Sequence, residues 1–153
     1  MEITIRKGIA NDINAALLMV KELATYEKAP NEVEVTIQEM QKEFTNNTFD
    51  FFVAEINTEI IGIALYYYKY STWKGKCIFL EDIIVTEKYR NKGVGKLLFD
   101  AVIAIAKQEQ VRRLEWQVLN WNAPAITFYE KFNANFDDEW INCKLTYHQL
   151  QNT

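Results

Sequence analysis

Residues 77–109 constrain the fold most, because a β-rich run, a glycine-containing turn and an amphipathic stretch follow one another directly. The run CIFLEDIIV (77–85) predicts a strand. Residues 93–109 repeat apolar side chains at helical spacing and predict a helix with one apolar face. The segment YRNKGVG (89–95) lies between them. The sequence therefore predicts a strand, a turn and a helix in immediate succession.

The rest of the chain predicts further strands and helices around this unit. The predicted strands are EITIR (2–6), FFVAEI (51–56) in a hairpin with IIGIALYYYKYS (60–71), LEWQVL (114–119) and EWINCKLTYH (139–148). The predicted helices cover residues 11–28, 36–44 with a Thr36–Glu39 capping box, and 123–132 with an Asn122 cap and a left-handed Asn133. This order predicts an α/β fold with a mixed central sheet.

Length and composition narrow the class of protein. With 153 residues we expect a single domain over 1–153, and the net charge of −4 argues against general nucleic-acid binding. Cys77, Cys143 and His148 do not make a zinc site, so we expect no metal. No apolar run reaches the roughly 18 residues of a membrane span, and the first residues lack a signal peptide's apolar run, so we expect a cytoplasmic protein.

The turn YRNKGVG is basic and raises the question of which anion it binds. A nucleotide P-loop aligned on Gly95 and Lys96 needs glycine at position 90 and a hydroxyl residue at 97, where this chain has Arg90 and Leu97. The pattern R-x-x-G-x-G does fit, with Arg90, Gly93 and Gly95 at its three fixed positions. Backbone amides at a helix start bind phosphate groups. The turn therefore predicts a phosphate-binding helix start other than a P-loop.

Several blocks resemble the GNAT superfamily of N-acetyltransferases, in particular its spermidine/spermine and thialysine acetyltransferase branch. These blocks are KELATYE (21–27), YYYKYSTWKGK (66–76), LEDIIV (80–85), YRNKGVG (89–95) and NWNAPAITFYEKFNA (120–134). The resemblance implies a GNAT acyl-CoA N-acyltransferase fold with a twisted mixed sheet flanked by helices, acetyl-CoA as cosubstrate, and a homodimer. It assigns acetyl-CoA binding to Ile83, Ile84, Val85, Arg90, Asn91, Lys92, Gly93, Val94, Gly95, Lys96, Asn122 and Tyr129.

Acetyl transfer to an amine needs a neutral amine and a proton for the leaving thiolate. The resemblance puts a catalytic glutamate at Glu81, which either helps to deprotonate the amine or only attracts a cationic substrate. In a regular strand, Glu81 and Asp82 point to opposite faces, so only one of them faces a given cleft. Tyr129, the candidate acid, follows Asn122 by seven residues, which returns it to nearly the same helix face.

The acceptor is expected to be cationic before it reacts. The candidate substrate-binding residues are acidic or aromatic, apart from one serine: Tyr26, Glu27, Ser71, Trp73, Glu139 and Trp140. Because polyamine-acetylating members carry an acidic residue at the position of Ser71, we expect a small primary amine, such as a thialysine-like amino acid, a diamine or a short polyamine. Two alternatives are a non-catalytic acetyl-CoA-binding module and a protein N-terminal acetyltransferase.

Overall fold

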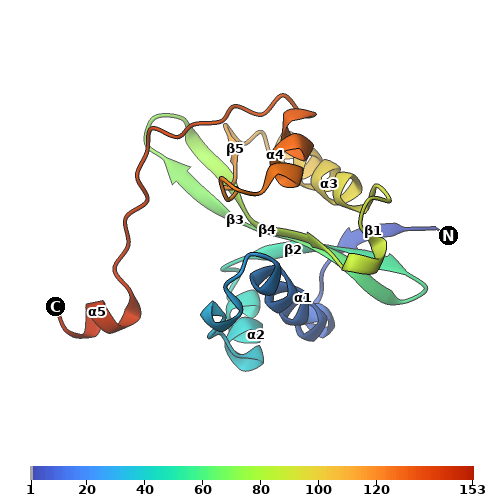
Figure 1. Cartoon of the computed structure of the whole chain (residues 1–153), viewed down its shortest axis with the longest axis horizontal. Helices are drawn as coiled ribbons and strands as arrows, with labels where there is room; N and C mark the ends of the chain where they lie inside the picture. The colour runs from blue at the N-terminus through green and yellow to red at the C-terminus, as the bar shows by residue number, and fades with distance from the viewer. Residues whose placement is uncertain (1) are drawn as a thin grey trace. The chain divides into compact units, whose positions relative to one another are not determined.

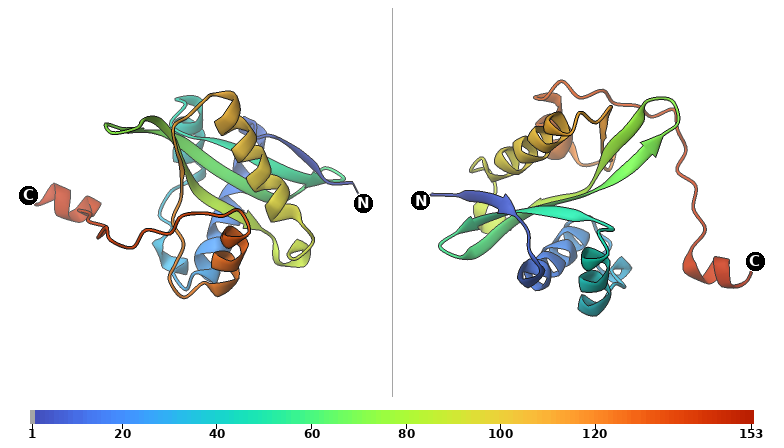
Figure 2. Two further views of the ribbon diagram at one scale, coloured as in Figure 1. Left: turned by 90° about the horizontal axis from the view of Figure 1, so that it is seen from above. Right: turned by 180° about the vertical axis from the view of Figure 1, so that it is seen from behind.

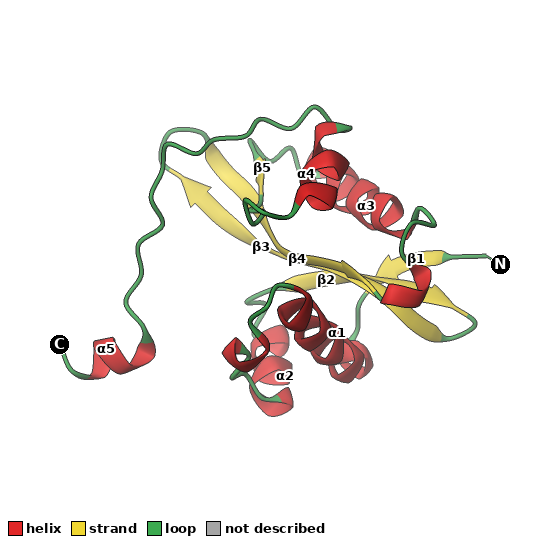
Figure 3. Ribbon diagram, in the orientation of Figure 1, coloured by secondary structure: helices red, strands yellow, loops and turns green. Residues whose placement is uncertain are grey.

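The computed structural model describes residues 2–153, which form two compact units. The first ends at Gln117 and the second runs from Val118 to Thr153. The first unit is a five-stranded sheet with helices on both of its faces, as Figures 1 and 3 show. Each unit is described on its own below.

The sheet of the first unit follows the order of the chain, β1-β2-β3-β4-β5. Its strands are β1 (Thr4–Lys7), β2 (Asp50–Ile56), β3 (Glu59–Ser71), β4 (Gly75–Val85) and β5 (Leu114–Glu115). Strands β1 to β4 pair antiparallel with one another, whereas β5 runs parallel to β4. The predicted mixed sheet is therefore confirmed. The predicted hairpin is present, and Asn57 and Thr58 form its turn with φ angles of 48° and 70°.

Helices cover both faces of this sheet. The helical segments are η1 (Ala10–Asp12), α1 (Ile13–Tyr26), η2 (Pro30–Glu32), α2 (Ile37–Thr45), η3 (Glu87–Tyr89) and α3 (Val94–Gln108). Helices α1 and α2 lie on one face and α3 lies on the other (Figure 2). The predicted capping box opens α2: the Glu39 amide donates to Thr36 Oγ1 at 3.2 Å, and the Thr36 amide donates to Glu39 Oε2 at 2.8 Å.

Each face of the sheet has its own apolar core. On the α1 side, Ile13 and Leu17 pack with Phe51, Val53 and other buried strand residues. On the opposite side, the buried residues of α3 are Val94, Leu98, Phe99, Val102 and Ala106. Helix α3 comes so close that a Cβ on Gly62 of β3 lies only 3.0 Å from Leu98 Cδ1. These contacts fix β3 and β4 between two helical layers.

The second unit contains two short helices, α4 (Ala123–Glu130) and α5 (Tyr147–Gln151). Asn122 caps α4 as predicted, accepting the Ala125 amide at 3.3 Å, and Asn133 has a left-handed φ of 57°. The predicted strand 139–148 is wrong, because residues 134–146 contain neither helix nor strand. A strand needs a partner to complete its ladder, and residues 118–153 provide none. The predicted strand 114–119 is reduced to β5 (Leu114–Glu115).

Candidate active site

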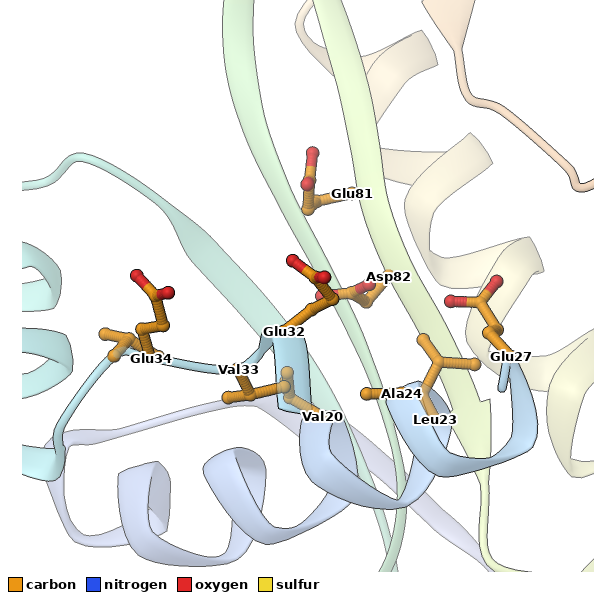
Figure 4. Close-up of a pocket in the computed structure, with 10 residues that line it drawn as sticks. Val20, Leu23, Ala24, Glu27, Glu32, Val33, Glu34, Glu81 and Asp82 are labelled. Carbon is orange, nitrogen blue, oxygen red and sulfur yellow. The ribbon is translucent and has the colours of Figure 1, made fainter. Parts of the chain in front are cut away.

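A cavity of about 440 Å³ lies on the α1 side of the sheet, within the first unit. Its walls come from the C-terminal part of α1, from η2 and the segment that follows it, and from β4 (Figure 4). Val20, Leu23 and Val33 contribute apolar surface. The volume and the partly apolar lining are typical of a site for a small molecule.

Both Glu81 and Asp82 line this cavity, because β4 has a β-bulge at this point. Leu65 of β3 lies opposite Asp82 and Tyr66 lies opposite Leu80, which leaves Glu81 as an additional residue without a partner. In a bulge, two successive residues share one position of the neighbouring strand. The strand is therefore not regular here, and the expectation that only one of the two carboxylates faces a given cleft is corrected.

The cavity is strongly negative. Its five carboxylates belong to Glu27, Glu32, Glu34, Glu81 and Asp82, and none of the lining residues is basic. Burial, followed by the nearby charges of Glu81 and Glu27, raises the pKa of Asp82 to about 6. Burial alone raises the pKa of Glu27. Such a cavity attracts cations and repels anions.

Tyr67 of β3 binds one of these carboxylates. Its phenol donates a hydrogen bond to Oε2 of Glu81 at 3.0 Å, and its ring stacks on Phe79 at a centroid distance of 5.4 Å. Burial, together with this hydrogen bond and the nearby carboxylates, raises the pKa of Tyr67 to about 12. The phenol therefore stays protonated at neutral pH and remains a donor to Glu81.

Four residues of this region were missed by the sequence analysis: Glu32, Glu34, Tyr67 and Asp82. For Asp82 the available signal was its position beside Glu81, but the bulge that turns it into the cavity leaves no mark in the run LEDIIV. Glu32 and Glu34 lie in a segment without helical or strand periodicity. Tyr67 is one of three consecutive tyrosines, which the sequence does not distinguish.

The turn before α3 combines backbone amides with open space. Gly93 is the N-cap of α3 and has a φ of 82°, a left-handed conformation that favours glycine. A Cβ added at Gly93 meets no atom within 4 Å. The first amides of a helix lack partners within it, and the helix dipole is positive at this end. This arrangement is compatible with the diphosphate group predicted from the sequence.

Arg90, predicted to bind the cofactor, is held against the protein in this structure. Its Nε donates to the carbonyl oxygen of Val85 at 2.9 Å, and an Nη atom donates to Oε1 of Glu22 at 3.2 Å. The guanidinium also lies over the ring of Tyr26, 5.3 Å from its centroid. These contacts connect the turn to the end of β4 and to α1, so Arg90 shapes the turn.

The other predicted residues of the turn are more accessible. Asn91, Lys92 and Lys96 are exposed, and Val94 is buried as part of the α3 core. The ammonium of Lys96 lies 2.6 Å from Oδ2 of Asp100, one helical turn away. Lys92 therefore adds positive charge at the surface beside Gly93, whereas the charge of Lys96 is partly balanced by Asp100.

The three predicted residues at the end of β4 have a neighbouring strand on one side, which is β3. Ile83, Ile84 and Val85 pair with β3. Toward β5, the ladder described in residues 2–153 has two pairs, Ile78 with Leu114 and Phe79 with Glu115. Beyond Phe79, β4 has no further strand partner within residues 2–153 on this edge, and such an edge can bind an extended ligand through backbone hydrogen bonds.

The second unit holds four of the predicted site residues. Asn122 and Tyr129 are both buried, consistent with their predicted place on one face of the helix. The amide of Glu139 donates to Oδ1 of Asp137 at 3.0 Å, and Trp140 is 72% exposed.

In the first unit, three predicted substrate-binding residues lie outside the lining of the acidic cavity. Tyr26 contacts Arg90, and Trp73 is 81% exposed in the β3–β4 hairpin. The hydroxyl of Ser71 accepts the amides of Trp73 and Lys74 at 3.2 and 3.1 Å, so it stabilises that hairpin turn. Of the predicted set, the structure brings Glu27 and Glu81 together.

Comparison with known proteins identifies the family of this chain. Residues 17–134 match the model of the Acetyltransferase (GNAT) family, well over half of the chain, and the chain belongs to that family. The predicted family and the predicted enzyme class, an N-acetyltransferase, are thereby confirmed.

The chain is similar to named members of one branch. It is 36% identical over 112 residues to the thialysine N-ε-acetyltransferase of Caenorhabditis elegans, covering 73% of this chain and 70% of that protein. It is 32% identical over 142 residues to the thialysine N-ε-acetyltransferase of Bos taurus, covering 86% of this chain and 84% of that protein. The predicted branch is therefore also confirmed.

Solved structures show the same fold at low sequence identity. An aminoglycoside acetyltransferase from a soil metagenome, in complex with trehalose, has a TM-score of 0.80 at 18% identity, covering 94% of this chain and 95% of that one. A predicted acetyltransferase from Clostridium acetobutylicum with acetyl-CoA has a TM-score of 0.77 at 18% identity, covering 94% of this chain and 96% of that one.

None of the helices in residues 2–153 has the length and apolar character needed to cross a membrane.

Proposed function

We propose that this chain transfers the acetyl group of acetyl-CoA directly to a primary amine of a small cationic substrate. The observation that carries the proposal is the place of the acidic cavity on β4. The same strand leads through η3 into the Gly93 turn. One continuous segment, residues 81–96, thus contributes carboxylates that attract an amine and a helix start that suits a diphosphate.

Acetyl-CoA supplies the activated thioester in this proposal. The amides that follow Gly93 bind its diphosphate, helped by Lys92 and Lys96. The β4 edge at Ile83–Val85 binds the extended pantetheine arm through its backbone. Asn91, Val94 and Gly95 complete the turn, and Asn122 contacts the arm.

The chain's own side chains move the protons. A carboxylate of the cavity, for which the sequence favours Glu81, takes a proton from the substrate ammonium. The phenol of Tyr129 then gives a proton to the leaving thiolate. No covalent enzyme intermediate is required, because the amine attacks the thioester carbon directly.

The charge of the cavity defines the substrate class. With five carboxylates and no basic residue in the lining, a second ammonium group is favoured and a carboxylate is repelled. The relatives named above are thialysine acetyltransferases, so we include a thialysine-like amino acid beside a diamine or a short polyamine. Among these, the cavity favours the diamine or polyamine.

Two other functions predict different behaviour. A non-catalytic acetyl-CoA-binding module needs the Gly93 turn but neither Tyr129 nor a cavity of this charge. A protein N-terminal acetyltransferase needs a groove for a peptide backbone, whereas the cavity is lined by carboxylates and apolar side chains.

The proposal is tested by following free-thiol release from acetyl-CoA across an amine panel: putrescine, cadaverine, spermidine, spermine, lysine, thialysine and a peptide with a free N-terminus. We expect amine-dependent release with the small amines and acetylated products by mass spectrometry. Binding of acetyl-CoA without release indicates the non-catalytic module, and release with the peptide alone indicates the N-terminal acetyltransferase.

We further propose a cytoplasmic homodimer in which residues 1–153 act as one domain. The exposed apolar side chains of the second unit support self-association: Phe136, Trp140, Ile141, Leu145, Tyr147 and Leu150 are each more than half exposed. Sedimentation equilibrium tests the dimer, with a mass of twice 18.0 kDa expected.

The proposed cytoplasmic location is supported by the two free cysteines, Cys77 and Cys143, which suit a reducing compartment.

A further inference from the structure

We propose that Asp82 accepts the proton that the substrate ammonium loses, and that Glu81 attracts and orients the substrate without taking the proton. This inference rests on the proposed acetyl transfer to an amine and assigns the base of that same site. It starts from the bulge in β4. Because Glu81 is the additional residue of the bulge, Asp82 lines the cavity together with it (Figure 4).

Glu81 is poorly suited to accept a proton. It is exposed to solvent, and its Oε2 already accepts the phenol hydrogen of Tyr67 at 3.0 Å. One of its two oxygens is thus already occupied by a donor from the protein, and the carboxylate is placed to attract a cationic substrate.

Asp82 has the opposite environment. It is half-buried, and among residues 2–153 it accepts no hydrogen bond and forms no ion pair. Every ionisable group facing it across the cavity is acidic: Glu81 on β4, Glu27 at the end of α1, and Glu32 and Glu34 on and after η2. Burial and like charge both favour its protonated form, consistent with a pKa raised to about 6. A base with this proton affinity works near neutral pH.

The proton balance of the reaction is complete with this assignment. The ammonium gives one proton to the Asp82 carboxylate, and the amine nitrogen forms a bond to the acetyl carbon as the carbon–sulfur bond breaks. The thiolate takes a proton from the phenol of Tyr129, and the phenolate recovers one from the nitrogen of the new amide. The proton on Asp82 leaves to solvent, so one proton is released for each acetyl group transferred.

The test is the pH dependence of kcat/KM between pH 5 and 10 with one small amine, measured for wild type, Asp82→Asn, Glu81→Gln and the surface control Glu59→Gln. For wild type we expect a rise that bends near pH 6 and is then flat. Asp82→Asn should be at least tenfold slower at pH 7.5, with no bend and a continuous rise toward the pKa of the free amine. Thermal unfolding checks that each variant is folded.

Glu81→Gln should keep the bend, moved to lower pH because one negative neighbour of Asp82 is lost, and should raise KM more than it lowers kcat. Glu59→Gln should match wild type. A wild-type profile in Asp82→Asn, or a bend that disappears in Glu81→Gln, overturns the assignment of Asp82. If Asp82→Asn does not fold, the Glu81→Gln profile decides alone. A wild type that releases no thiol with any amine overturns the proposed function itself.

Discussion

The guanidinium of Arg90 donates from Nε to the carbonyl oxygen of Val85 at 2.9 Å. This hydrogen bond links the start of the Gly93 turn to the end of β4. A second bond runs from Arg90 to Glu22 on α1. Arg90 was expected to bind the diphosphate through its charge. Its hydrogen bonds instead hold the backbone of the turn, whose amides are the predicted diphosphate ligands. Its contribution to coenzyme binding is expected to come mainly from the shape of the turn.

Substitutions at Arg90 separate shape from charge. Glutamine removes the positive charge but retains an N–H group that can donate to Val85, whereas alanine removes both. We expect coenzyme A to bind Arg90→Gln within about threefold of wild type and Arg90→Ala at least tenfold more weakly, the equivalent of about 1.4 kcal/mol. Fluorescence titration measures both. Equal losses in the two variants would show that charge is the main contribution.

Tyr129 is the predicted acid, and Tyr129→Phe removes only its hydroxyl. We expect turnover to fall at least tenfold, because the thiolate then leaves without a positioned proton donor. The free energy of unfolding should change by about 1 kcal/mol or less, the usual contribution of one hydrogen bond. The control is Tyr147→Phe, at a residue that is 77% exposed. Unchanged turnover in Tyr129→Phe would exclude this residue as the acid.

The raised pKa of Asp82 predicts a cost in stability. The folded state binds its proton more tightly than the unfolded state, whose carboxyl has a pKa of 3.8, so the free energy of unfolding decreases as pH rises from about 4 through about 6. Asp82→Asn removes this penalty and should stabilise the protein by roughly 1 to 3 kcal/mol at pH 7.5 and little at pH 4. Urea unfolding at both pH values measures the difference. Destabilisation of equal size at both values would contradict this account.

The fold was largely predictable because its strands and helices follow hydrophobic periodicity. The hairpin of β2 and β3, the capping box at Thr36 and the strand–turn–helix unit around Gly93 all have local signals. The prediction of a strand over 139–148 was wrong. A segment of high β propensity forms a strand only when a neighbouring strand pairs with it, and the sequence does not show whether such a partner exists.

The candidate site was predictable only in part. Glu27 and Glu81 were identified, and the cavity that contains both supports their selection. The contribution of Asp82 depends on a bulge opposite Leu65 and Tyr66, a register shift between strands that alternation within one strand cannot reveal. The position of Ser71 in a hairpin turn likewise depends on tertiary structure.

The charge of the cavity predicts a preference between two matched amines. Cadaverine and lysine have the same carbon chain between their nitrogens, but lysine adds a carboxylate, which the five acidic side chains repel. We expect kcat/KM for cadaverine to exceed that for lysine by at least tenfold at low salt, and the ratio to shrink as salt screens the charges. Steady-state thiol release measures it. A preference for lysine would mean that a cation outside this lining binds the carboxylate.

The central claim is that the amides opening α3 bind the diphosphate of coenzyme A, and calorimetric titration of wild type, Gly93→Ala and Gly75→Ala tests it most directly. Both glycines have positive φ angles, 82° and 106°, so alanine strains the backbone similarly at each, but only the Gly93 side chain enters the open space before the helix. We predict that wild type and Gly75→Ala bind coenzyme A alike and that Gly93→Ala binds at least tenfold more weakly. No detectable binding by wild type, or equal affinity in all three proteins, would contradict the claim.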